Sequence, residues 1–163
     1  MTGGAGSRVH EIDPCCPDVA GRAIRAAVAA LVEGALVVLP TETVYGIACR
    51  PDDASATARL FAAKRRPRGL SLPVLAATAD AAWELGVPDD RGRRLAAALW
   101  PGPLTMVVPR SDRSKGWALG ERGESIALRV PDLGRARNSE ARCLNLWAIR
   151  CQAMQLTANE WSW

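Results

Sequence analysis

The sequence predicts a single α/β domain in which helices cover a largely parallel or mixed β-sheet. Short apolar segments rich in β-branched residues alternate with segments whose apolar residues recur every three to four positions, as strands and amphipathic helices do. The length of 163 residues is that of one domain. A content of 48% hydrophobic and 23% charged residues is ordinary for a globular protein and too apolar for intrinsic disorder.

The first elements follow from local patterns near the amino terminus. Residues 1–17 contain glycine, proline and cysteine without a sustained period, so we expect a flexible arm. A helix is expected between Asp18, a suitable N-cap residue, and Gly34, whose type is common just past a helix end. Residues 35–39 are apolar and end at Pro40, which predicts a strand buried on both faces.

The remaining elements are predicted by the same two periods. We expect strands at 44–49, from 72–75, at 104–108 and at 125–129, and helices at 55–64, 79–85 and 90–99. Trp100-Pro-Gly-Pro103 must be a turn, because its prolines cannot continue a helix. The polar, glycine-containing residues 109–124 predict a long functional or mobile loop. The domain is expected to cover 18–137, followed by a divergent tail over 138–163.

Composition and short motifs exclude several classes of protein. The longest apolar stretch, 26–39, contains Glu33 and Gly34 and is shorter than the roughly 20 residues that a membrane span needs. The amino terminus lacks the apolar core of a secretory signal. The five cysteines form no C-x-x-C pair and are accompanied by a single histidine, so we expect reduced thiols in a cytoplasmic protein and no zinc site.

The positive charge of the chain suits an anionic ligand. A net charge of +4 and a pI of about 9.1 fit either a phosphate-bearing ligand or a nucleic acid. Only two of the 21 cationic residues are lysines, Lys64 and Lys115. The first belongs to Lys64-Arg-Arg-Pro-Arg68, which is followed by Gly69-Leu-Ser71. These cations favour phosphate recognition, although cations at a helix end also interact favourably with the helix dipole.

Two further segments carry candidate ligand groups. Pro40-Thr-Glu-Thr-Val-Tyr-Gly46 follows a predicted strand, where open α/β sheets bind ligands. Its threonines either orient a polar substrate or bond their own backbone in a turn, and the residues alone leave both readings open. Arg129 ends an apolar strand, so its guanidinium needs an acidic partner, a ligand or a solvent-exposed position. The Walker A, dinucleotide-binding, nucleophile-elbow and H-E-x-x-H motifs are absent.

Four segments in this order resemble the threonylcarbamoyl-AMP synthase family, whose core is the YrdC-like domain. They are Pro40-Thr-Glu-Thr-Val-Tyr-Gly46, Lys64-x-Arg66-Pro67, Trp100-Pro-Gly-Pro-Leu-Thr105 and Leu128-Arg-Val-Pro131. The similarity runs from about Ala23 to Asp132. It implies a twisted, mixed α/β sheet around a cationic cavity.

The resemblance also implies a reaction. L-Threonine and bicarbonate form a carbamate, which attacks the α-phosphorus of ATP and releases pyrophosphate and threonylcarbamoyl-AMP. A tRNA threonylcarbamoyl transferase then uses this product to modify tRNA in the cytoplasm. Thr41 would contact threonine, and Arg129 would pair with an anionic group of the substrates. Mg²⁺ is the expected companion of the triphosphate.

The nucleotide contacts are likewise implied by the resemblance. Lys64 and Arg66 would hold the ATP phosphates as the catalytic cations, and Arg68 and Ser125 would lie near the nucleotide. The alternative function is a non-catalytic module that binds tRNA or double-stranded RNA through the same basic cavity.

The carboxyl-terminal part departs from the family pattern. The family's Gly-Pro-Leu strand and Ser-Ala-Asn-x-Ser-Gly signature are not intact here, and the nearest match is Leu156-Thr-Ala-Asn159. Thr157 and Asn159 are therefore the candidate replacements for the Ser-x-Asn pair. From this divergent or truncated terminus we expect substrate binding with poor turnover of ATP.

Overall fold

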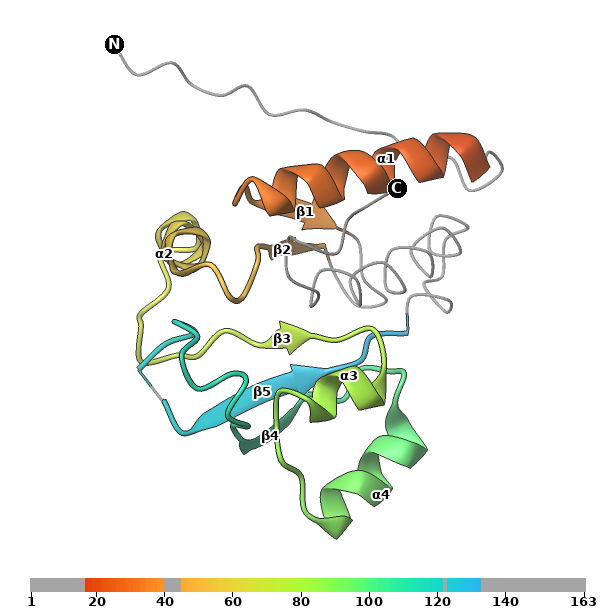
Figure 1. The fold of residues 1–163 in the computed structure, drawn as a ribbon, viewed down its shortest axis with the longest axis vertical. Coiled ribbons are helices and arrows are strands. Elements are labelled where there is room, and N and C mark those ends of the chain that lie inside the picture. The colour runs from red at the N-terminus through yellow and green to blue at the C-terminus, as the bar shows by residue number, and fades with distance from the viewer. Residues whose placement is uncertain (1–16, 40–44, 122, 133–163) are drawn as a thin grey trace.

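The computed structural model describes residues 17–39, 45–121 and 123–132. Within these ranges the chain forms four helices and five strands (Figure 1). The helices are α1 (Pro17–Val32), α2 (Ala54–Ala63), α3 (Ala79–Trp83) and α4 (Asp90–Leu99). The strands are β1 (Val37–Leu39), β2 (Gly46–Ala48), β3 (Val74–Leu75), β4 (Met106–Pro109) and β5 (Ser125–Arg129). The predicted helices and strands of this part are all present, several of them shorter than expected.

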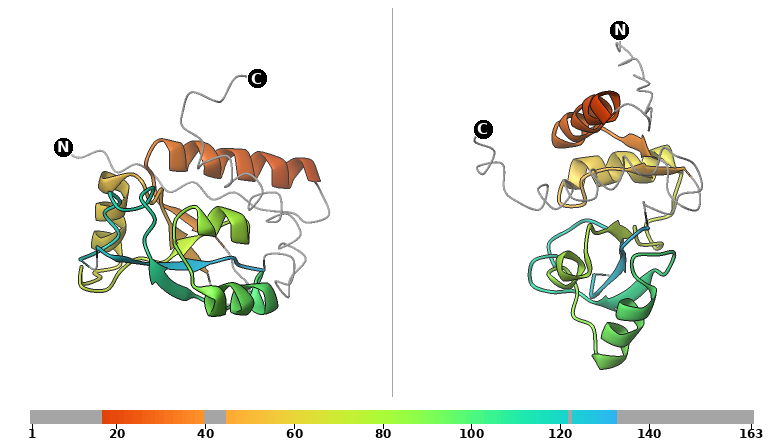
Figure 2. Two further views of the ribbon diagram at one scale, coloured as in Figure 1. Left: turned by 60° about the horizontal axis from the view of Figure 1, so that its bottom comes forward. Right: turned by 90° about the vertical axis from the view of Figure 1, so that its right-hand side faces the viewer.

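The described strands form two sheets. β1 and β2 pair antiparallel, with Val38 opposite Ile47. The other sheet has the order β3-β5-β4, in which β3 is parallel and β4 antiparallel to β5. The prediction of a mixed sheet is therefore confirmed. α1 lies beside β1, and α1 and α4 lie at opposite ends of the described structure (Figure 2).

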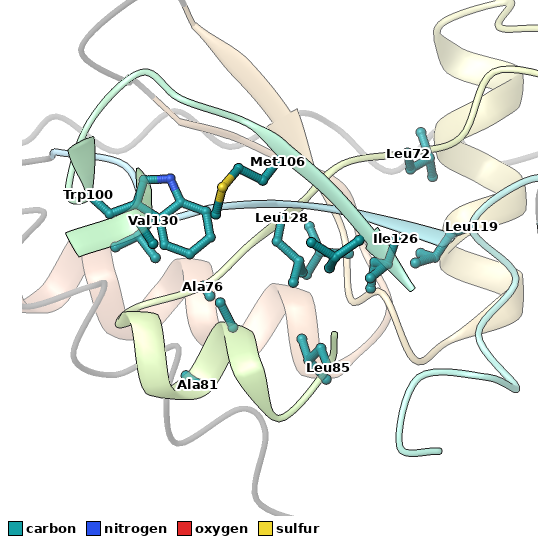
Figure 3. Packing of buried hydrophobic residues seen from close by; sticks show 14 of the residues in the cluster. Leu72, Ala76, Ala81, Leu85, Trp100, Met106, Leu119, Ile126, Leu128 and Val130 are labelled. Carbon is teal, nitrogen blue, oxygen red and sulfur yellow. The ribbon is translucent and has the colours of Figure 1, made fainter. Parts of the chain in front are cut away.

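The core lies on one face of the three-stranded sheet. Met106 and Val108 alternate with exposed neighbours on β4, and Ile126 and Leu128 do the same on β5 with half-buried ones. Side chains of α3 and of the segment after it cover this face, as Ala81 and Leu85 do in Figure 3. The core continues to Leu60 and Phe61 of α2 and to Trp100, which stacks on Trp83 with ring centroids 5.0 Å apart. This packing joins α2 and the turn after α4 to the same core as β5.

The expectation of a strand buried on both faces at 35–39 is wrong. β1 comprises only Val37–Leu39, and Val38 is 65% exposed. The reason is that β1 is paired with β2 alone among the described residues, and a two-stranded ribbon buries one face of its alternating side chains. No helix in the described part of the chain is long and apolar enough to cross a membrane.

Candidate functional site

The cation-rich segment follows directly from the way α2 ends. The Asp53 carboxylate caps the amino end of α2 and accepts hydrogen bonds from the Ser55 and Ala56 amides. At the other end the Arg65 amide donates to the Ala62 carbonyl and the Arg66 amide to the Phe61 carbonyl. This is a Schellman ending, in which the residue past the cap is left-handed, and Arg65 has φ 47° there. The ending turns the chain sharply into residues 64–71, here called the cation loop.

Arg66 closes the cation loop on itself. Its Nε donates to the Leu70 carbonyl at 2.9 Å and its Nη2 to the Ser71 carbonyl at 3.0 Å. A planar guanidinium presents its donors in a rigid fork that suits two such acceptors, whereas an ammonium group carries rotatable donors on a single point charge. Arg66 therefore sets the shape of the loop, and its Nη1 makes no hydrogen bond to the described residues.

Lys64, Arg65 and Arg68 carry the other charges of the loop. Lys64 is the exposed C-cap residue of α2, and the last turn of α2 contains no basic residue. Arg68 is exposed, with its guanidinium carbon 5.4 Å from the centroid of the Phe61 ring. An interaction with the helix dipole therefore fits Lys64 and Arg65, which directly follow the last turn of α2, because Arg66 bonds loop carbonyls and Arg68 lies over an aromatic ring.

A second loop packs against the cation loop (Figure 1). We call residues 111–124, between β4 and β5, the buttress loop. The Leu72 amide donates to the Leu119 carbonyl at 2.7 Å, and the Glu121 amide donates to the Arg68 carbonyl at 2.9 Å. Between these bonds Gly120 has φ 133°, and a Cβ placed there would lie 2.9 Å from the Arg68 carbonyl oxygen. The close approach requires glycine on both grounds.

Arg110 lies at the base of the buttress loop and was missed by the sequence analysis. It is 6% exposed. Its Nε donates to the Ser125 carbonyl at 3.0 Å, and its Nη1 donates to the Ser114 and Trp117 carbonyls at 2.9 Å each. Burial lowers the pKa of the guanidinium from its usual value. The only sequence signal was a cation between an apolar strand and a glycine-containing loop, which does not predict burial.

Arg129 lies at the carboxyl end of β5. There its neighbour across the parallel pair is Leu75, the last residue of β3. The Arg129 Nε donates to the Gly102 carbonyl at 3.2 Å, and the Gly102 amide donates to the Val130 carbonyl at 2.8 Å. The predicted Trp100-Pro-Gly-Pro103 turn, which contains a cis Trp100–Pro101 bond, therefore contacts this arginine directly.

The described site residues fall at two ends of one strand pair. The cation loop precedes β3, and Ser125 begins β5, so both lie at the amino ends of the parallel strands. Arg129 lies at the opposite ends, about 13 Å from Ser125 at the rise of an extended chain. The structure brings the cation loop, Ser125 and Arg110 together through the buttress loop. Arg129 belongs to a separate position on the same sheet.

Three of the sequence-predicted positions lie outside the described residues. They are Thr41 with its Pro40–Val44 segment, and Thr157 and Asn159 near the carboxyl terminus. Residues 1–16 of the predicted arm and the divergent tail 138–163 also lie outside, whereas Pro17, the last residue of that predicted arm, begins α1. Within the described ranges, no group of three or more histidine, cysteine, aspartate or glutamate residues could hold a metal ion.

Comparisons with known proteins identify the family of this chain. The model of the Sua5–YciO–YrdC family, whose description is "Telomere recombination", matches residues 29–139. The threonylcarbamoyl-AMP synthase of Chromohalobacter salexigens is 44% identical over 108 residues, which are 65% of this chain and 57% of that protein. The chain therefore spans little more than half the length of this relative.

Solved structures of the family share the fold. The crystal structure of P. abyssi Sua5 complexed with L-threonine is 32% identical, with a TM-score of 0.61 over 77% of this chain and 36% of that one. The structure of E. coli YciO, at 24% identity, matches with a TM-score of 0.66 over 78% of this chain and 59% of that one. The family match over 29–139 and the identity to the synthase show that this chain is a member of the Sua5–YciO–YrdC family, with threonylcarbamoyl-AMP synthases among its relatives.

Proposed function

We propose that this chain acts as a threonylcarbamoyl-AMP synthase, using ATP, L-threonine and bicarbonate. The observation that carries the proposal is the separation of the cation loop from Arg129 along β3 and β5. A span of about 13 Å suits a substrate pair laid along one concave, cationic cavity, with phosphates at one end and an amino acid carboxylate at the other. The activity named for the synthase relative supports this assignment.

Each end of the cavity has its own task. Lys64 supplies a point charge to the terminal phosphates of ATP, and Arg66 offers Nη1 to a phosphate oxygen while its other nitrogens hold the loop. Arg68 and Ser125 lie near the nucleotide. At the other end Arg129, held by the Gly102 carbonyl, pairs with the threonine carboxylate, and Thr41 contacts the same amino acid.

The chemistry depends on alignment of anions. The threonine amine adds to bicarbonate with loss of water to give a carbamate. A carbamate oxygen then forms a bond to the α-phosphorus of ATP, and the bond from that phosphorus to the bridging oxygen of pyrophosphate breaks. Carbamate, α-phosphate and leaving group are all negative, so the cations lower the barrier by holding them in line.

Magnesium would arrive with the triphosphate. The described residues provide no group of three or more metal-ligating side chains, and the cation loop is positively charged. The described part of the chain therefore does not fit a dedicated metal cage. The product would pass to an enzyme that transfers the threonylcarbamoyl group to tRNA.

The test is release of pyrophosphate from ATP by the purified chain. We expect release, however slow, only when both L-threonine and bicarbonate are present. Loss of dependence on either co-substrate would contradict the proposal. Binding of RNA without binding of ATP or threonine would favour a non-catalytic RNA-binding module instead.

A further inference from the structure

We propose that Arg110 is a positioning residue for ATP, acting through the buttress loop on the cation loop. The inference deepens the proposed function and rests on it, because the position of the cation loop matters for ATP only if that loop holds phosphates. Arg110 itself is buried and contacts neither Lys64 nor Arg66 among its hydrogen bonds.

The contacts of Arg110 satisfy two of its three guanidinium nitrogens, and its Nη2 is buried without a hydrogen-bond partner among the described residues. Its hydrogen bonds within the described residues go to three backbone carbonyls, those of Ser114, Trp117 and Ser125. A buried carbonyl without a hydrogen-bond donor is costly. An arginine guanidinium has five N–H donors and can therefore bond several carbonyls at once. Ser114 adds an anchor, since its hydroxyl donates to the Leu85 carbonyl at 2.6 Å. The inside of the buttress loop is thereby fixed to the sheet.

The outer edge of the buttress loop is hydrogen-bonded to the cation loop and so helps to hold it in place. The Leu119 carbonyl and the Glu121 amide bond the two ends of the segment Arg68–Leu72, and Gly120 packs between them. Arg66 bonds carbonyls inside the same segment. The cation loop is therefore held from within by Arg66 and from outside by the buttress loop.

Displacement of this segment would move the phosphate-binding charges. A shift of about 1 Å in a positioning element can cost about a hundredfold in the rate of a step that depends on alignment. The same shift lengthens charge-assisted contacts to phosphate, each worth about 1.5–3 kcal/mol, or about tenfold or more in Kd. The affinity for threonine, which is held at the other end of β5, would not change with this shift. The inference thus separates ATP affinity from threonine affinity, which a general loss of stability would not do.

Two alanine substitutions in one loop provide the matched test. Gly120→Ala would place a Cβ 2.9 Å from the Arg68 carbonyl oxygen at a left-handed φ, so the cation loop must move. Gly116→Ala adds a methyl group with nothing within 4 Å. Calorimetric titration of the full 163-residue chain gives the Kd for ATP and for L-threonine. We expect the ATP Kd to rise about tenfold or more in Gly120→Ala and both constants to stay within about twofold in Gly116→Ala.

Arg110 is tested in the same assay with Arg110→Met and Arg110→Lys. We expect both to raise the ATP Kd while leaving the threonine Kd unchanged, with faster hydrogen exchange at the Leu72 and Glu121 amides. An unchanged ATP Kd in both Arg110 variants, or an equal loss of both ligands in Gly120→Ala, would overturn the inference. A parent chain that binds no ATP would instead overturn the proposed function.

Discussion

Alanine substitutions at Lys64 and Arg66 should both weaken ATP binding, but only the substitution at Arg66 should also lower the stability of the chain markedly. Lys64 is exposed, so Lys64→Ala removes the proposed contact to phosphate and a solvent-screened interaction with the α2 dipole, but no hydrogen bond within the loop. Arg66→Ala removes that kind of contact and also two bonds to the Leu70 and Ser71 carbonyls. A charge-assisted hydrogen bond is worth about 1.5–3 kcal/mol, so each variant should bind ATP roughly 10- to 150-fold more weakly.

The stability of the unliganded chain separates the two residues. Because Arg66 is only half-buried, we discount its two loop bonds to a total of about 1–2 kcal/mol. For a domain of this size that loss lowers Tm by about 2–8 °C, whereas Lys64→Ala should shift Tm by less than about 2 °C. Thermal denaturation without ligand and calorimetric titration with ATP measure the two effects.

A matched control tests whether charge alone explains the result. Lys115→Ala removes the other lysine, which forms an exposed ion pair with Asp112 at 2.5 Å. It should change neither Tm nor ATP affinity appreciably. Equal Tm values for the Lys64 and Arg66 variants would refute the role given to Arg66 in shaping the loop. Unchanged ATP affinity in both would refute the phosphate site.

Three further predictions concern packing, thiol chemistry and threonine recognition. In thermal denaturation, Gly86→Ala should lower the free energy of unfolding by about 1–3 kcal/mol, because a Cβ there would overlap Val108. Gly123→Ala, which has open space around it, should leave the free energy of unfolding unchanged. Burial and the nearby Asp53 raise the pKa of the Cys49 thiol to about 11. Only about a thousandth of the Cys49 side chains are therefore thiolate at pH 8, so peptide mapping should find this cysteine alkylated slowly at that pH. Fast alkylation of Cys49 at pH 8 would contradict its burial. Thr41→Val should weaken binding of threonine, and a parent chain that binds serine, threonine and valine equally would show that Thr41 has no such role.

The local elements were predictable because their signals are local. The α4 helix was predicted with its observed bounds, since Asp89 and Asp90 mark its start and Trp100-Pro-Gly-Pro103 its end. The exposure of Val38 was not predictable, because an apolar run does not reveal whether its strand lies within a sheet or in a two-stranded ribbon.

The site was predictable only in part, because its geometry depends on long-range pairing. The motifs indicated Lys64, Arg66 and Arg129 as functional. They did not indicate that β3 pairs parallel with β5, which sets the cation loop and Arg129 at opposite ends. Arg110 was missed for a related reason: a buried cation satisfied by carbonyls of its own loop leaves no periodic signal.

Cross-titration tests whether the ATP phosphates bind at the cation loop and threonine binds separately at Arg129. ATP and L-threonine are each titrated into the parent chain, Lys64→Ala and Arg129→Ala. We expect Lys64→Ala to lose affinity for ATP but keep threonine binding, and Arg129→Ala to lose affinity for threonine but keep ATP binding. If each substitution weakened both ligands equally, or if neither changed either ligand, the assignment of phosphates to the cation loop and of threonine to Arg129 would be contradicted.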